Sequence, residues 1–105
     1  MAKRHPGSEA DPMYYIAKAT ANPDFTVTIE WQHGPTSIVD FKPTIAKGKV
    51  FTPLADVAFF TGKLYVAEDG YYLGWPEEID FSADSLWYRT HPDDLKRDYP
   101  DVAAE

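Results

Sequence analysis

Cysteine is absent from this chain of 105 residues. Without it the protein can form no disulfide bond, no thiolate metal site and no cysteine nucleophile, which suits a reducing cytoplasm. Long apolar runs are also missing, because no stretch approaches the ~20 residues that span a bilayer. No apolar segment follows the basic residues at the start, so we expect no secretory signal. These absences lead us to expect a soluble, cytoplasmic protein with no membrane contact.

Sequence motifs that mark common catalytic and cofactor sites are missing as well. The chain contains no Gly-x-Ser-x-Gly elbow and neither of the glycine-rich motifs that bind phosphates or dinucleotides. Its histidines, His5, His33 and His91, have no histidine partner two or four positions away. We expect them to be solvated rather than to bind zinc, which needs three or four ligands. We therefore expect no catalytic residue, no metal and no cofactor.

Basic residues are outnumbered, and the net charge is −7. This balance disfavours nucleic-acid binding, in which lysine and arginine neutralise phosphates. Residues 1–67 carry seven basic and six acidic side chains, whereas residues 68–105 carry three basic and eleven acidic ones. The acidic last third is either a solvated tail or a surface that attracts a basic partner.

The length of the chain suits one domain, and an aromatic content of 15% argues against disorder. Residues 1–12 are polar and contain Pro6, Gly7 and Pro12, so we expect a disordered arm. We expect a single α+β domain over residues 13–90 and an acidic tail over residues 91–105.

The strongest periodicity lies in residues 25–32, where Phe25, Val27, Ile29 and Trp31 alternate with polar residues. Because successive side chains of a strand point to opposite faces, this segment is predicted to be a strand with one buried face. Short turns link it to predicted strands over residues 14–20 and 37–41, which together form an antiparallel meander. A hairpin with an Asp-Gly turn is predicted over residues 64–75.

Two short helices complete the expected domain. Thr52 is the predicted N-cap of a helix over residues 53–61, with Pro53 in its first turn and Gly62 after its end. Ser82 is predicted to cap a second helix that ends at Tyr88. Residues 42–50 are predicted to be a lysine-rich loop that is either hydrated or binds an anion on its backbone N–H groups.

The expected fold is therefore α+β: an antiparallel β-sheet of about five strands with two short helices, in the order β-β-β-α-β-β-α. The helix over residues 53–61 should cover one face of this sheet and leave the other face open. We assign Trp31 and Trp75 to the core, because each shares a strand face with other apolar residues. Exposed tyrosine and tryptophan are favoured at protein interfaces. The predicted partner-binding residues are Tyr72, Trp87, Glu77, Glu78 and Asp84.

A catalytic alternative rests on Asp40 and Asp80, which each follow an apolar strand residue. Two carboxylates about 5–9 Å apart can work as an acid and a base if burial raises one pKa. The competing interpretation is that each carboxylate accepts backbone hydrogen bonds at a strand end.

Several blocks of the sequence resemble a bacterial family of unknown function. They are Val27 to Phe41, Gly48 to Phe60, Gly70, Leu73, Trp75-Pro76, Ile79-Asp80-Phe81 and Ser82 to Leu86. The pattern departs from the family at His33-Gly34, where Asp-Gly is usual, and at Glu77-Glu78, where Asn-Gly is usual. Members are small α+β domains found alone or attached to a helix-turn-helix segment, and no such segment follows residue 88.

The resemblance implies a fold and no established activity. Such domains are often encoded beside a small toxin-like protein, so a partner role follows by analogy. Together with the charge pattern, it leads us to expect a non-enzymatic protein-interaction domain. Its partner would be the small neighbouring protein or a second copy of the chain.

Overall fold

The computed structural model describes residues 14–98, so the predicted arm (residues 1–12) and the end of the predicted tail lie outside the described residues. The strands are β1 (Ile16–Ala21), β2 (Thr26–Trp31), β3 (Thr36–Asp40), β4 (Tyr65–Val66), β5 (Tyr72–Trp75) and β6 (Ile79–Ser82). The helices are α1 (Lys42–Ala46), the 3-10 helix η1 (Lys49–Ala55), α2 (Val57–Gly62), α3 (Ala83–Thr90) and α4 (Pro92–Asp98). The expected α+β class is confirmed.

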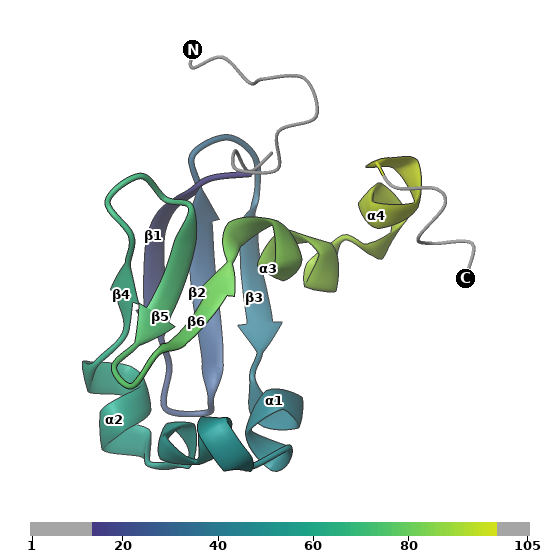
Figure 1. The fold of residues 1–105 in the computed structure, drawn as a ribbon. Coiled ribbons are helices and arrows are strands. Elements are labelled where there is room, and N and C mark those ends of the chain that lie inside the picture. Colours follow the sequence, from purple (N-terminus) through teal and green to yellow (C-terminus); the bar gives the residue numbers. More distant parts are fainter. Residues whose placement is uncertain (1–13, 99–105) are drawn as a thin grey trace.

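The strands form two antiparallel sheets rather than the single sheet of about five strands that we expected. One sheet has the order β1-β2-β3 and the other the order β4-β5-β6. The helical connection from Lys42 to Gly62 carries the chain from β3 to the second sheet (Figure 1). β4 then pairs with β5, its neighbour in the sequence, and the unexpected β6 pairs with β5 on the other side.

The predicted helix over residues 53–61 is divided into η1 and α2. The break lies at Asp56, whose extended backbone (φ −84°, ψ 116°) ends the 3-10 helix. The Asp56 carboxylate accepts a hydrogen bond from the backbone N–H of Ala58 at 3.0 Å, so Asp56 and not Thr52 is the N-cap of α2. The predicted loop over residues 42–50 contains α1, which has Pro43 in its first turn, where a missing N–H costs little.

The last two helices pack against the start of the described chain. Ser82 caps α3 as predicted and accepts a hydrogen bond from the Ser85 N–H at 3.2 Å. α4 occupies the first part of the predicted tail. The hydroxyls of Tyr14 and Tyr88 donate to Oδ2 of Asp98 at 3.0 and 2.8 Å. The hydrogen bonds to the Asp98 carboxylate therefore fix α4 to α3 and to the segment before β1.

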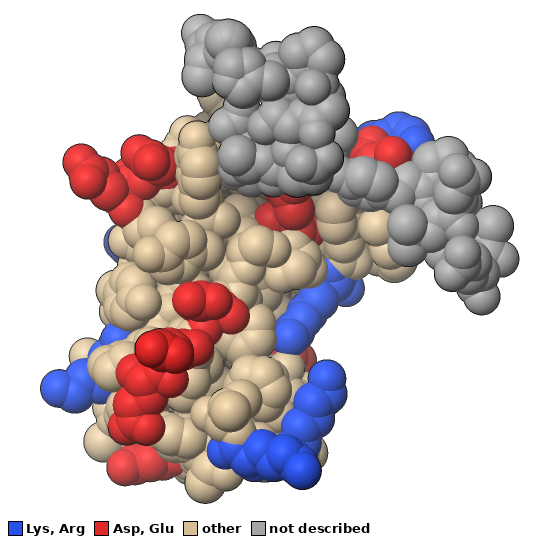
Figure 2. Space-filling model, viewed as in Figure 1, with Lys and Arg blue, Asp and Glu red and all other residues tan. Residues whose placement is uncertain are grey.

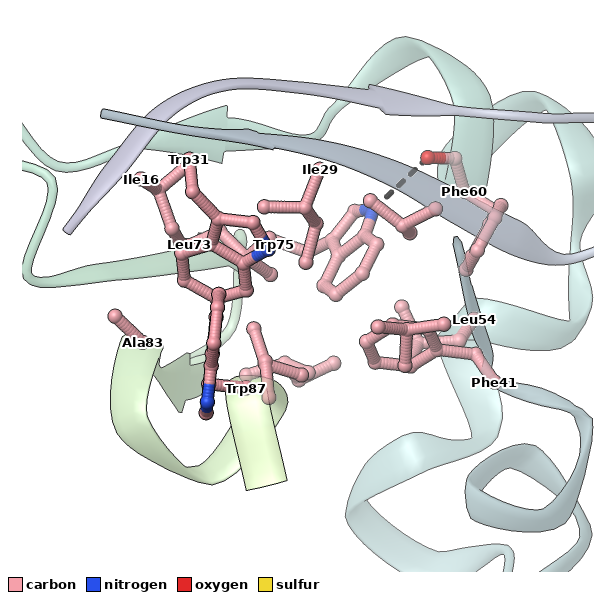
Figure 3. Packing of buried hydrophobic residues seen from close by; sticks show 14 residues of the cluster. Ile16, Ile29, Trp31, Phe41, Leu54, Phe60, Leu73, Trp75, Ala83 and Trp87 are labelled. Atoms are coloured by element: carbon pink, nitrogen blue, oxygen red, sulfur yellow. Dashed lines mark hydrogen bonds between the residues drawn. The ribbon is translucent and has the colours of Figure 1, made fainter. Parts of the chain in front are cut away.

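The core lies between the two sheets and contains side chains from both (Figure 3). Trp31 and Trp75 are 6% and 0% exposed, which confirms their assignment to the core. The indole N–H of Trp75 donates to the backbone oxygen of Phe60 at 2.9 Å. Because each large apolar side chain contributes about 2–3 kcal/mol when fully buried, this aromatic core is the main source of stability in a small domain.

The outward face of each sheet is exposed, in contrast to the expected single sheet with a helix on one face. In β2 the buried Val27 and Ile29 alternate with the more exposed Thr26, Thr28 and Glu30. In β5 the exposed Tyr72 precedes the buried Leu73. The inward face of each sheet is thus covered by the other sheet and by the helices, and each outward face is available for contact.

Candidate protein interface

Two tyrosines lie in contact on the outward face of the second sheet. Tyr65 and Tyr72 are 44% and 40% exposed, and their ring centroids are 6.4 Å apart in an edge-to-face arrangement. The register pairs Tyr65 with Gly74 and Tyr72 with Ser82 across neighbouring strands. Since tyrosine buries a large area with little loss of conformational entropy, such a pair is well suited to protein contact.

Gly74 allows the Tyr65 ring to lie close to the sheet. A Cβ atom added at Gly74 would approach Oη of Tyr65 to 3.1 Å, the Cβ of Asp80 to 3.0 Å and the backbone oxygen of Ile79 to 2.7 Å. A larger residue at this position would displace the tyrosine ring. Gly74 thus leaves room for the Tyr65 ring next to Asp80, whose side chain is exposed on β6.

The hairpin between β5 and β6 supplies further carboxylates. Glu77 and Glu78 are exposed and have φ angles of 72° and 64°. The chain therefore makes the tight turn with two glutamates, although this left-handed backbone favours glycine. Red side chains over this hairpin form an acidic strip on the face shown in Figure 2. The tyrosine pair, Asp80 and the two glutamates therefore form one surface, which we call the tyrosine–acid face.

Asp84 and Trp87, the other predicted partner-binding residues, contact Tyr14 and lie outside the tyrosine–acid face. The Asp84 carboxylate is half-buried and accepts a hydrogen bond from the backbone N–H of Tyr14 at 2.9 Å. Trp87 is only 7% exposed and stacks between Tyr14 and His91 at centroid distances of 4.3 and 3.8 Å. Its indole N–H donates to Oδ2 of Asp94 at 2.8 Å. The expectation that Trp87 lies on an open face was wrong, because Tyr14, His91 and Asp94 of α4 cover it.

Tyr65 is the member of this face that the sequence analysis missed. Its signal was available, because Tyr65 lies one position from the partly buried Leu64 and Val66, and alternation therefore places it on the outward face.

The structure does not bring Asp40 and Asp80 together as a catalytic pair. Asp40 lines a groove beside β3, whereas Asp80 lies on the outward face of the second sheet. The backbone N–H of Lys42 donates to the Asp40 carboxylate at 2.9 Å, and the Lys42 ammonium lies 3.0 Å from the same oxygen. These contacts lower the pKa of Asp40, which is the opposite of what a general acid needs.

Within residues 14–98, no group of three or more His, Cys, Asp or Glu side chains is arranged to hold a metal ion. The helices in the same part of the chain are all too short or too polar to cross a bilayer.

The chain shows significant similarity to no curated protein and to no solved structure. A family does match it: the one described as "Protein of unknown function (DUF2442)" covers residues 16–92, from β1 to the first residue of α4. This stretch is well over half of the 105 residues and includes every strand of the two sheets. The chain therefore belongs to the DUF2442 family of proteins of unknown function, as its sequence blocks led us to expect.

Proposed function

We propose that this protein is a non-enzymatic interaction domain that binds a basic protein partner through its tyrosine–acid face. The observation that carries the proposal is the contact between Tyr65 and Tyr72, two half-exposed rings on an outward sheet face next to exposed carboxylates. Tyrosine is enriched at protein interfaces, where its ring supplies a large contact area.

The charge of the face selects the chemistry of the partner. Glu77, Glu78 and Asp80 surround the rings with negative charge, and no basic residue lies within β5, the hairpin or β6. Lysine and arginine can contact a tyrosine face through cation–π attraction and form ion pairs with the carboxylates. Such a surface therefore suits a partner with basic side chains and would repel an acidic one.

The small toxin-like protein encoded beside related domains is the partner that the family resemblance suggests. A second copy of the chain is the other candidate partner. The molar mass of the complex distinguishes these two candidates. Light scattering after size exclusion, with the purified chain alone and with the neighbouring protein, distinguishes a homodimer from a mixed complex.

A defined probe tests the face itself. We expect a capped nonapeptide of alternating lysine and serine to shift the amide and ring NMR signals of Tyr65, Tyr72 and the hairpin, and the matched glutamate–serine peptide to leave them unchanged. Tyr72→Thr should weaken binding and keep the fold, since threonine suits a strand. Ile38→Thr, on the outward face of the other sheet, is the matched control. Shifts confined to other surfaces, or equal binding of both peptides, would disprove the proposal.

A further inference from the structure

The strand β3 (Thr36–Asp40) lies at the edge of the first sheet and has one unpaired side. The Phe41 N–H donates to the Phe25 oxygen at 2.9 Å, which fixes the alternation of hydrogen bonds between β2 and β3. In an antiparallel pair, every second residue directs its N–H and C=O to the partner strand. Val39 therefore faces β2 with its backbone groups, whereas those of Ile38 point away from the sheet.

A groove runs along this unpaired side. It has a volume of about 460 Å³, and its lining includes Ile38, Asp40, Pro43, Thr44, Lys47 and Arg89. β3 forms one wall, α1 forms another and the end of α3 closes the groove. Figure 2 shows basic side chains around α1 and the end of α3, opposite the acidic strip on the same face. Arg89 and Lys47 outnumber Asp40 in the lining, so the groove carries a small positive charge on a protein whose net charge is −7.

Arg89 is the central cation of this groove. Its guanidinium lies 4.9 Å from the ring centroid of Phe41 and donates to Oγ1 of Thr44 at 2.9 Å. A longer contact of 3.4 Å joins it to the backbone oxygen of Asp40, which is on the unpaired side of β3. These contacts hold the planar guanidinium in a fixed orientation beside the strand edge.

Within residues 14–98 Arg89 forms no ion pair at contact distance, because every such pair involves Lys42 or Arg97 instead. The Asp40 carboxylate acts on Arg89 only at longer range and is itself paired with Lys42. Partial burial against the groove lowers the pKa of Arg89, and the charge of Asp40 opposes this shift. The side chain as a whole remains exposed, so an anion from solution can reach it. A partly desolvated cation gains most from an anion that supplies charge and hydrogen bonds together. Lys47 lines the same groove and adds a second positive charge.

The strand edge indicates that the anion is carried by a peptide. Within the described chain no hydrogen bond reaches the outward backbone groups of Ile38, whose side chain is 63% exposed. An extended segment can pair with such an edge through its main chain and place alternate side chains in a neighbouring groove.

We propose that an extended peptide segment of another protein adds to the free edge of β3 as a fourth strand and places an acidic side chain on Arg89. The peptide backbone pairs with the outward N–H and C=O of Ile38. The carboxylate of the peptide accepts hydrogen bonds from the remaining N–H groups of the Arg89 guanidinium. This site is separate from the tyrosine–acid face, since none of the residues of that face lines the groove.

Three capped pentapeptides test the proposal by titration followed with 15N NMR. The first is Thr-Val-Glu-Val-Thr, the second has glutamine in place of glutamate, and the third is the first with its central amide N-methylated. We expect the first peptide to protect the Ile38 amide from hydrogen exchange and to shift the Arg89 side-chain signal. The glutamine peptide should bind at least tenfold more weakly, and the N-methylated peptide should lose the protection of Ile38.

Variants separate the strand edge from the charge. Ile38→Pro removes an N–H that the β2–β3 ladder does not use, so the domain should fold and fail to bind, whereas Ile38→Thr should bind normally. Arg89→Gln should remove the preference for glutamate over glutamine, and Tyr72→Thr should leave peptide binding unchanged. If Ile38→Pro does not fold, the N-methylated peptide provides the same test.

Equal binding of the glutamate and glutamine peptides would overturn the proposal, as would undiminished binding by folded Ile38→Pro. Sodium acetate is the final arm. If acetate shifts the Arg89 side-chain NMR signal and the first peptide does not bind, strand addition is also overturned. That result would indicate a site for small carboxylates.

Discussion

The hairpin between β5 and β6 allows a quantitative test of the link between sequence and stability. Glu77 and Glu78 adopt φ angles of 72° and 64°, in the left-handed region that disfavours side chains with a Cβ atom. The double substitution Glu77→Asn and Glu78→Gly introduces the residues that tolerate this backbone best. We expect the variant to be more stable than the wild type.

The magnitude follows from two opposing effects. A left-handed backbone costs an L-residue about 1–2 kcal/mol, and asparagine and glycine relieve most of it at both positions. Glycine also increases the entropy of the unfolded chain, which costs about 0.5–1 kcal/mol. The net gain in the free energy of unfolding should be about 1–2 kcal/mol, which raises the Tm of a domain of this size by about 5–10 °C.

Urea denaturation followed by tryptophan fluorescence measures this gain, because Trp31, Trp75 and Trp87 are all at most 7% exposed and report unfolding. The variant Glu77→Gln with Glu78→Gln is the matched control: it removes the same charges but keeps the unfavourable backbone. A rise in stability as large in the glutamine variant as in the asparagine–glycine variant would refute the conformational argument. Both variants should bind the basic probe peptide more weakly, since both lose the carboxylates.

Three further predictions concern the core, the sheet junction and the acid limit of stability. Trp75→Phe leaves the Phe60 oxygen without its buried donor, so the free energy of unfolding should fall by about 1–3 kcal/mol in urea denaturation. Gly70→Ala should lower the Tm, because Gly70 has a φ of 81° and an added Cβ would collide with the backbone of β1. Gly62→Ala, which meets no atom within 4 Å, should leave the Tm unchanged or raise it. The pKa of Asp98 is lowered to about 2 by hydrogen bonds from the neighbouring guanidinium and two tyrosine hydroxyls. Because the folded pKa lies below the unfolded one, its stabilising effect is present above pH ~4 and is lost as the pH falls towards 2. Asp98→Asn should flatten this part of the Tm profile.

The sequence predicts the meander well, because its signals are local. The alternation over residues 25–32 corresponds to β2. Trp31 and Trp75 are buried because each lies on the apolar face of its strand, as the alternation predicted. The turn at Asp69-Gly70 leads into β5, and Gly70 adopts the positive φ that the turn prediction required. Tyr72 is exposed as its position in the strand indicated.

The second sheet and the burial of Trp87 depend on information that is not local. β6 was missed because the preceding turn carries Glu77 and Glu78 in place of the expected glycine signal. Trp87 is buried by Tyr14, which lies far away in the sequence, and by His91, one helical turn further on. No pattern within residues 82–88 encodes those contacts, so propensity and periodicity could not find them.

The hydrogen bond between the Tyr14 hydroxyl and Asp98 joins two residues that are 84 positions apart in the sequence. The two ends of the described domain therefore lie at the same corner, and Figure 1 places that corner at the opposite end of the molecule from the β5–β6 hairpin. A domain with adjacent ends can be inserted into a loop of a host protein without stretching either chain. In such a chimaera the hairpin would point away from the host, so the domain could serve as a transplantable binding module.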